Sequence, residues 1–324
     1  MDPLVIERPY KFRRFIFIGV IGFVALVCVL YFGFFRAPAN FPKDAIVSLK
    51  EGMTLREISQ ALEDAHIVRS AVAFQSATMI VSDDHGARAG SYLFTKPANV
   101  LRVALRIAGG ETGIPMKKVT FPEGITTREM ASILEKSLPD FDAALFLRLA
   151  QPKEGYLFPD TYFFPENVVP NDVLTALNKN YNAKVADFQK DIDTSGHSER
   201  EIVIMASLLE REASGEEDIA MISGILWDRL DVGMRLQVDA PFYFLLGKQS
   251  KDLTQSDLAL ESAYNTYKHT GLPPGPIGNP GSVAIDAALH PKKSEYLYYL
   301  HDKDGKVHFA RTFKEHESNI KAFL

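Results

Sequence analysis

Two glutamates at the end of an apolar stretch are the first candidates for catalysis. Residues 204–218 have the sequence IMASLLEREASGEED, in which Glu210 and Glu212 follow a run of apolar or small residues. A carboxyl group at the end of a buried segment must be solvated, paired, or held in an apolar pocket with a raised pKa, and the last case suits a general acid. Composition alone leaves open the alternative that both glutamates lie on the solvated end of a helix.

The segment before these glutamates has the features of a buried helix. Ser198 and Glu201 form a capping box, which predicts a helix that begins at residue 199 and continues to about residue 213. Residues 202–209, IVIMASLL, are apolar or small on every side. We therefore expect this helix to be buried rather than amphipathic.

Helical spacing separates the two glutamates. Residues two positions apart on a helix point about 200° away from each other, so Glu210 and Glu212 are not expected to be the two facing carboxylates of ordinary glycosidases. Glu210 has the small neighbours Ala206 and Ser207, which leave room for a substrate to approach. Glu212 shares its side with larger apolar residues and is expected at a solvent-facing rim. Spacing therefore slightly favours Glu210.

Several other chemistries lack their motifs. The sequence has no Gly-rich phosphate loop after a strand, no G-x-S-x-G elbow and no H-E-x-x-H motif. The eight histidines are scattered, and the single cysteine, Cys28, excludes internal disulfides and a cysteine-based metal cage. We therefore expect neither a metal nor a cofactor.

The composition is that of a globular protein. With 46% hydrophobic and 24% charged residues, 324 residues can build a sizeable core in one or two domains. The net charge of −5 argues against a nucleic-acid partner, which would usually require a basic face.

The N-terminal region contains a candidate membrane anchor. Residues 15–35 are uncharged and mostly apolar, and a helix of this length spans a hydrocarbon core of about 30 Å. Lys11, Arg13 and Arg14 precede it, so the positive-inside rule places the tail at 1–14 in the cytoplasm and the rest of the chain outside. A cleaved signal peptide is the alternative, but the apolar run is longer than such peptides carry.

A strand–turn–helix pattern occurs twice in the first half of the chain. Residues 51–63 and 123–135 match at seven of 13 positions, and both segments keep a Thr-x-x-Glu capping box. The repeat units are predicted near 45–80 and 117–150. With the linker they form a first module, residues 36–150, which is expected to be a small α/β unit that is either structural or glycan-binding.

The second module, residues 151–324, mixes helices and strands without a regular alternation. The expected elements are an irregular aromatic stretch at 154–166, helices at 171–193, 199–213, 218–232 and 283–289, and strands at 296–302 and after Gly305. This order predicts an α+β fold class.

Six sequence blocks occur in an order that resembles a known family. The blocks EGYLFPDTY, IMASLLEREA, GMRLQVDAPFYFLLG, AYNTY, GLPPGPIGNPG and AALHP follow one another between residues 154 and 291. Together they resemble the YceG-like family of endolytic murein transglycosylases, over most of residues 43–324. The resemblance implies a LysM-like module within 36–150, behind an N-terminal membrane helix, and a transglycosylase catalytic domain at 151–324.

The activity that the resemblance implies is that of a lyase on peptidoglycan. Such enzymes cut the β-1,4 bond between N-acetylmuramic acid and N-acetylglucosamine within a glycan strand and leave a 1,6-anhydromuramoyl end. The family's catalytic glutamate falls in the block A-S-x-x-E, which here ends at Glu210. Glu210 would protonate the leaving oxygen and then take the proton from the sugar's C6 hydroxyl as that hydroxyl attacks C1. Because the substrate supplies the nucleophile, one carboxylate suffices.

The other blocks offer candidate saccharide-binding residues. Their amide, hydroxyl and carboxylate groups suit the acetamido and hydroxyl groups of a glycan, and their tyrosines can stack on sugar rings. The candidates are Gln237, Asp239, Tyr264, Asn265, Thr266, Tyr267 and Asn279. The alternative for each is a loop scaffold in which the polar groups satisfy nearby backbone, and Glu154 is expected to be structural.

The resemblance also implies a location and partners. We expect a single-pass protein of the inner (cytoplasmic) membrane with its catalytic body outside the cytoplasm. The expected partners are peptidoglycan strands and the membrane, with cell-wall synthases as candidates. A non-catalytic peptidoglycan-binding scaffold is the alternative, although the glutamate in the A-S-x-x-E block disfavours it. Hydrolysis instead of lyase chemistry is a further alternative, which differs by one water in the product mass.

Overall fold

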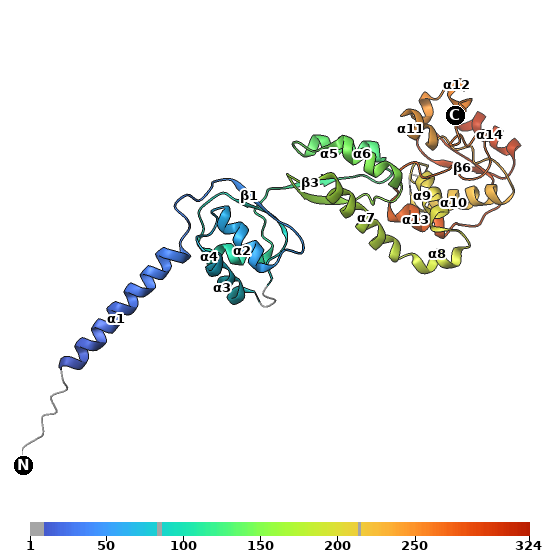
Figure 1. Cartoon of the computed structure of the whole chain (residues 1–324). Helices are drawn as coiled ribbons and strands as arrows, with labels where there is room; N and C mark the ends of the chain where they lie inside the picture. The colour runs from blue at the N-terminus through green and yellow to red at the C-terminus, as the bar shows by residue number, and fades with distance from the viewer. Residues whose placement is uncertain (1–9, 83–85, 213–214) are drawn as a thin grey trace, which may run out of the picture. The chain divides into compact units, whose positions relative to one another are not determined.

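The chain forms two compact units, Met1–Pro115 and Met116–Leu324 (Figure 1). The computed structural model describes residues 10–82, 86–212 and 215–324. Most of the predicted cytoplasmic tail, residues 1–9, and residue 213 at the expected end of the buried helix lie outside the described residues. Among the described residues, strands pair antiparallel in three two-stranded sheets, β1 with β2, β3 with β4 and β5 with β6. The predicted mixture of helices and strands is confirmed.

The first unit begins with a long apolar helix. α1 (Tyr10–Leu30) continues into a π-helical turn, η1 (Tyr31–Phe35). Residues 16–35 form a segment with a mean hydropathy of 2.7, and none of the segment is buried inside the protein. The segment is therefore long and apolar enough to cross a membrane, as the sequence predicts.

The rest of the first unit is a small helix–strand module. Its elements are β1 (Ala45–Leu49), α2 (Leu55–Asp64), α3 (Ala71–Val81), β2 (Gly90–Phe94) and α4 (Val100–Gly109). One core joins them, in which Leu62, Phe74 and Tyr92 are fully buried. Thr54 and Glu57 make the predicted capping box at the start of α2.

The second unit contains the remaining elements. In chain order they are β3 (Met116–Thr120), α5 (Thr127–Ser137), α6 (Ala143–Ala150), η2 (Gln151–Lys153), β4 (Thr161–Pro165), α7 (Pro170–Ala186), α8 (Gln189–Ser195), α9 (Glu199–Leu209), α10 (Glu216–Asp231), α11 (Ala240–Leu246), η3 (Ser250–Asp252), α12 (Gln255–Leu258), α13 (Ser282–Leu289), β5 (Tyr298–His301), β6 (Val307–Ala310) and α14 (Phe313–Phe323). One core cluster lies among β3, α5, α6 and α7, and a second surrounds α9.

Three parts of the second unit differ from the sequence-based expectation. The expected helix at 171–193 is two helices, because the chain turns at Phe188, which packs against the core around α9. The stretch at 154–166, expected to be irregular, contains β4, which β3 stabilises by pairing. The C-terminal helix α14 was not expected; Thr312 caps its first turn.

The boundary expected near residue 150 falls inside the second unit. β3 pairs with β4 across that boundary, with Val119 opposite Tyr162, and α6 packs against α7. The second strand–turn–helix segment, β3 to α5, therefore packs with the residues that follow it, while the first segment lies in the other unit. The contacts separate the two units at residues 115 and 116 instead.

Helix α9 lies at the centre of its core cluster, as its apolar composition predicts. Residues 202–209 are all buried, and the helix packs against α13 and α10 (Figure 1). Its last turn tightens, because the N–H groups of Arg211 and Glu212 donate to the carbonyls of Leu208 and Leu209 at 3.1 and 3.0 Å. The helix therefore ends at Leu209, earlier than expected, and Glu210 is its C-cap residue.

Asn279 fastens the loop before α13 to two other loops. Its Oδ1 accepts hydrogen bonds from the N–H groups of Gly155 and Leu157 at 2.9 and 3.0 Å. Its Nδ2 donates to the carbonyl of Ile125 and to Glu154 Oε1, both at 2.9 Å. The side chain is fully buried. All its donors and acceptors therefore serve the fold, and Glu154 is structural, as expected.

This network predicts that Asn279→Asp lowers stability. The change replaces the Nδ2 donor with an oxygen, breaks both of its bonds, and brings a second carboxyl group against Glu154. We expect the free energy of unfolding of the second unit to fall by about 3 kcal/mol. Urea unfolding followed through Trp227, the single tryptophan, measures it. Asn182→Asp, on the exposed side of α7, is the matched control, expected to change stability by less than about 0.5 kcal/mol. An equal effect of the two changes would contradict the assignment.

Candidate active site

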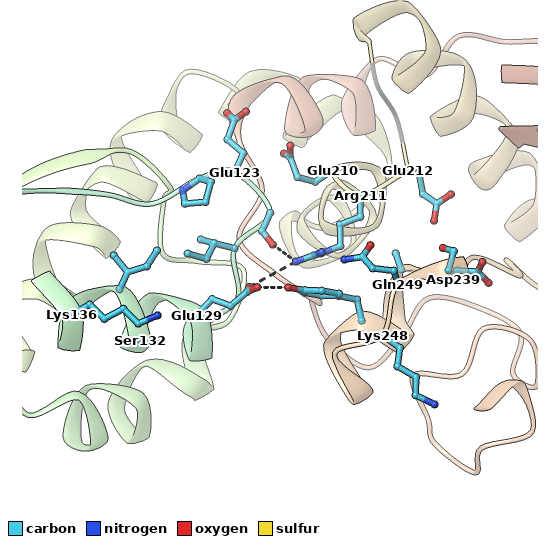
Figure 2. Close-up of a pocket in the computed structure, with 17 residues that line it drawn as sticks. Glu123, Glu129, Ser132, Lys136, Glu210, Arg211, Glu212, Asp239, Lys248 and Gln249 are labelled. Carbon is cyan, nitrogen blue, oxygen red and sulfur yellow. Dashed lines mark hydrogen bonds and ion pairs between the residues drawn. The ribbon is translucent and has the colours of Figure 1, made fainter. Parts of the chain in front are cut away.

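A cleft of about 620 Å³ lies in the second unit and contains Glu210. The turn at 122–125, helix α5, the end of α9, the first part of α11 and residues 248–250 line it. In Figure 2, Glu123 lies on one side of Glu210, and Glu212 and Asp239 lie together on the other. Five carboxylates therefore share this cleft, the fifth being Glu129.

Glu210 is a half-buried carboxyl group with one strong donor. Its Oε2 accepts a hydrogen bond from the backbone N–H of Gly281 at 2.9 Å. Burial raises the pKa of Glu210, and the negative charge of Glu123 raises it further, while the Gly281 bond and Arg211 lower it. The raised pKa suits a group that must be protonated before it acts as an acid.

Two glycines allow the backbone to approach Glu210. Gly124 has a φ of +71°, and a Cβ there would lie 3.0 Å from Glu210 Cγ. A Cβ on Gly281 would lie 1.8 Å from Glu123 Oε1. The positive φ and the close contact favour glycine at position 124, whereas a side chain at position 281 would require the Glu123 side chain to move.

Arg211 connects three walls of the cleft. Its Nη2 donates to the carbonyl of Gly124 at 3.0 Å and lies 3.8 Å from Glu129 Oε2, and its guanidinium stacks 3.8 Å above the ring of Tyr243 (Figure 2). The hydroxyl of Tyr243 donates to Glu129 Oε1. Burial raises the pKa of Glu129, but its hydrogen bonds and Arg211 bring it below the ordinary value, so Glu129 is the charged partner of Arg211.

The expectation that Glu212 lies at a solvent-facing rim is wrong. Glu212 lines the same cleft as Glu210, because α9 ends before either residue and the helical angle of about 200° does not apply. Its Oε2 accepts a hydrogen bond from the hydroxyl of Tyr299 at 2.8 Å. Burial raises the pKa of Glu212 to about 7.

The small neighbours of Glu210 do not leave room for substrate, contrary to expectation. Ala206 and Ser207 are buried, and the Oγ of Ser207 accepts a hydrogen bond from the N–H of Ile277 at 3.1 Å. These small side chains admit the loop before α13. The space for a ligand lies on the other side of the chain, beyond the end of the helix.

Of the predicted binding residues, the structure brings only Asp239 to the cleft with Glu210. Asp239 Oδ1 accepts a hydrogen bond from the hydroxyl of Tyr267 at 2.7 Å. Gln237 is exposed with a φ of +50°, outside the cleft lining. Tyr264 packs against Phe244, with ring centroids 5.2 Å apart.

Asn265, Thr266 and Asn279 do not face the cleft, which corrects their predicted role as direct ligands. Asn265 Nδ2 donates to two backbone carbonyls at 2.9 and 2.8 Å, and Thr266 Oγ1 donates to the carbonyl of Val238 at 2.9 Å. All three side chains are buried and bonded to protein. The loop-scaffold alternative therefore describes them, and Tyr267 supports Asp239 rather than presenting a free ring face.

Sequence reasoning missed several residues of the cleft. They are Glu123, Glu129, Ser132, Lys136, Arg211, Tyr243, Lys248 and Gln249. The sequence did contain a signal for Glu123 and Glu129, because Glu123 belongs to the repeated turn and Glu129 to the repeated capping box. Within residues 10–82, 86–212 and 215–324, no group of three or more His, Cys, Asp or Glu side chains could hold a metal ion.

Comparison with known proteins gives one consistent result. The model of the YceG-like family matches residues 47–322. The chain is 30% identical over 305 residues to a protein of Bacillus subtilis (strain 168) named endolytic murein transglycosylase, and the match covers 86% of this chain and 84% of that protein. A protein of the same name from Streptococcus pneumoniae serotype 2 is 27% identical over 358 residues, covering 93% of this chain and 64% of that protein.

A solved structure extends the likeness to three dimensions. The crystal structure of a YceG-like protein from Listeria monocytogenes matches with a TM-score of 0.57 at 30% sequence identity, over 85% of this chain and 99% of that one. The blocks around Glu210 lie inside the range that the family model matches. The chain belongs to the YceG-like family.

Proposed function

We propose that this protein is an endolytic lytic transglycosylase of peptidoglycan. It cleaves the β-1,4 bond between N-acetylmuramic acid and N-acetylglucosamine within a strand and leaves a 1,6-anhydro end. The observation that carries this proposal is the half-buried Glu210, whose pKa burial raises, at the wall of a cleft in a chain of the YceG-like family.

Glu210 performs both proton transfers. Its protonated carboxyl gives a proton to the glycosidic oxygen as the bond from C1 to that oxygen breaks. The resulting carboxylate, which the Gly281 N–H stabilises, then accepts the proton of the sugar's C6 hydroxyl as that oxygen bonds to C1. Glu210 ends protonated, as it began, and no water is consumed.

A hydrolase is the second candidate. Glu212 and Asp239 line the same cleft and could act as a base toward water, as the second carboxylate does in glycoside hydrolases. Both already accept a tyrosine hydroxyl, which favours a supporting role over proton abstraction. A non-catalytic scaffold is the remaining alternative, and the environment of Glu210 argues against it.

The site residues follow from the same proposal. Glu210 is the catalytic residue, and Asp239 contacts the glycan in the cleft. We propose that Gln237 and Tyr264 bind further along the strand, outside the cleft itself. Asn265, Thr266, Tyr267 and Asn279 contribute by shaping the loops around the site rather than by touching the saccharide.

The apolar segment at 16–35 supports a membrane-anchored protein. With basic residues before this segment, we propose a cytoplasmic N-terminus, a single span of the inner membrane, and a catalytic body on the outer side, where peptidoglycan lies. Cell-wall synthases are proposed partners.

The two strand–turn–helix segments remain a proposed internal repeat. We propose that the first belongs to a LysM-like module and that the second, although predicted to belong to the same module (36–150), serves the catalytic domain (151–324). The support is that the turn of the second segment lines the cleft.

Glu210→Gln is expected to abolish cleavage. The amide has the shape of the acid but cannot give or take the proton, so the rate of product formation should fall by about 10²- to 10⁴-fold. Mass spectrometry of the products from purified glycan strands measures this rate and also distinguishes lyase from hydrolase products. Wild-type products with 1,6-anhydro ends support the lyase, whereas products one water heavier would establish a hydrolase. Full activity in the variant would refute the role of Glu210.

Glu123→Gln is expected to move the pH profile. The charge of Glu123 raises the pKa of Glu210, so its removal lowers that pKa. A general acid loses its proton as pH rises through its pKa, and the alkaline limb of kcat/KM should therefore shift to lower pH. Glu135→Gln, an exposed site on α5, makes the same charge change as a control. An unchanged alkaline limb in Glu123→Gln would contradict this coupling.

A further inference from the structure

One side of helix α5 forms a wall of the cleft. The residues of α5 that line the cleft are Glu129, Ser132, Ile133 and Lys136. Spacings of three, four and seven residues place them on the same side of the helix. Glu129, in the first turn, accepts a hydrogen bond from the hydroxyl of Tyr243, and Lys136 lies in the last turn. The wall therefore runs from a bonded carboxylate to a cation.

The cations that line the cleft differ in what they bind. Of the described residues, these cations are Arg211, Lys248 and Lys136. Arg211 lies 3.8 Å from Glu129 Oε2, and Lys248 Nζ donates to both carboxylate oxygens of Asp257 at 2.8 and 2.7 Å. Lys136 is exposed, and its ammonium group has no hydrogen bond or ion pair within residues 10–82, 86–212 and 215–324. Its charge is therefore available to a ligand.

Ser132 offers a second polar group, one turn before Lys136. Its side chain is half-buried, and its hydroxyl makes no hydrogen bond within the part of the chain that the structure describes. Residues four positions apart on a helix have their Cβ atoms about 5–6 Å apart, so one ligand group can reach both side chains. An ammonium group and a hydroxyl both donate hydrogen bonds. Together they suit a ligand carboxylate.

The acidic residues of the cleft lie elsewhere. In Figure 2, Ser132 and Lys136 lie at one side of the view, and Glu212 and Asp239 lie at the other. A carboxylate on a ligand is repelled by these acidic side chains and attracted by Lys136. The cleft therefore favours one end for an anionic group, while the uncharged part of a ligand can lie beside Glu210.

We propose that Lys136 and Ser132 form a subsite for a carboxylate on a side chain of the peptidoglycan strand. This proposal rests on the proposed function, since it takes the ligand to be such a strand. The sugars of the strand are N-acetylated and uncharged, so its carboxylates belong to its side chains. They are the lactyl carboxylate of a muramoyl residue without a peptide, and the carboxylates of a peptide stem joined to the lactyl group. Lys136 makes the cleft select strands in which such a carboxylate is free.

The alternative role for Lys136 is to stabilise its own helix. A cation in the last turn of a helix interacts favourably with the carbonyl end of the helix dipole. Such a role would affect the stability of α5, but it would not depend on whether the ligand carries carboxylates. The test therefore varies the charge of the lysine and the charge of the ligand together.

The test measures binding without turnover. The full chain carrying Glu210→Gln is reconstituted in nanodiscs, and the Kd is measured for soluble peptide-bearing strands, for strands stripped of their peptides, and for both after every carboxylate has been converted to a neutral amide. Adding Lys136→Gln should raise the Kd for strands with free carboxylates about fivefold, as expected for a partly exposed ion pair. The Kd for the amidated strands should change less than about 1.5-fold.

The two kinds of strand identify the source of the carboxylate. An effect of Lys136→Gln on peptide-bearing strands assigns the subsite to a stem carboxylate, because their lactyl groups are already amides. An effect confined to stripped strands assigns it to the lactyl carboxylate. No effect on either kind would overturn the proposal, and so would an equal effect on the amidated strands.

Matched variants isolate the charge of Lys136. Lys136→Arg keeps the charge and should keep the Kd within about twofold. Lys190→Gln, at an exposed position on α8 outside the cleft lining, makes the same charge change and should leave the Kd unaltered. Raising the salt to about 1 M should remove most of the effect of Lys136→Gln, because salt screens exposed charges. An effect that salt leaves unchanged would overturn the charge pairing.

Turnover separates this proposal from the proposed function. In the otherwise wild-type chain, Lys136→Gln should raise KM about fivefold for the strands that it binds, with kcat changed less than about twofold, because the subsite lies away from the reacting bond. A loss confined to kcat would overturn the subsite. If wild type yields no anhydro ends while the effect of Lys136→Gln on Kd holds, the proposed chemistry fails and the subsite stands.

Discussion

Two helix ends meet at one carboxyl group, and the arrangement of the cleft follows from this contact. Glu210 is the C-cap residue of α9, where the partial negative charge of a helix end disfavours an ionised carboxyl group. Its Oε2 accepts a hydrogen bond from the N–H of Gly281, the N-cap residue of α13, where the positive end of the helix dipole favours an ionised carboxyl group. The carboxyl group is therefore held between opposing influences, with burial as the largest effect on its pKa. Such a group can both give and take a proton.

The early end of α9 lets three consecutive residues take different tasks. Glu210 turns toward Gly281, Arg211 toward the turn at 122–125 and Tyr243, and Glu212 toward Tyr299. Arg211 lies 3.8 Å from Glu129, and its charge is the smallest of the named influences on the pKa of Glu210. A continuous helix would have placed these side chains at fixed angles around one axis. The tightened last turn places them around one cleft instead.

Local patterns in the sequence predicted the elements better than the site. Some features depend only on residues that are close in the sequence, so spacing alone identifies them. These are the apolar run in α9 and the capping boxes at Thr54, Thr126 and Ser198. Glu210 itself came from family resemblance. The expected saccharide ligand Asn279 and the expected rim residue Glu212 were misplaced, because their partners lie more than eighty residues away in the sequence. The periodicity of a sequence does not indicate which distant loop will form the hydrogen bonds of a buried amide or carboxylate.

The two strand–turn–helix segments show how the same local sequence acquires different roles. In the first, the turn at Glu51 and Gly52 is exposed, and a Cβ on Gly52 would meet nothing. In the second, Gly124 is buried against Glu210, its N–H donates to the carbonyl of Asn279 at 2.8 Å, and the charge of Glu123 raises the pKa of Glu210. Both turns use a positive φ to reverse the chain before a capped helix. The segment fixes the turn, and the loop that packs against that turn decides whether its glutamate lies close enough to a half-buried carboxyl group to raise its pKa, as Glu123 does for Glu210.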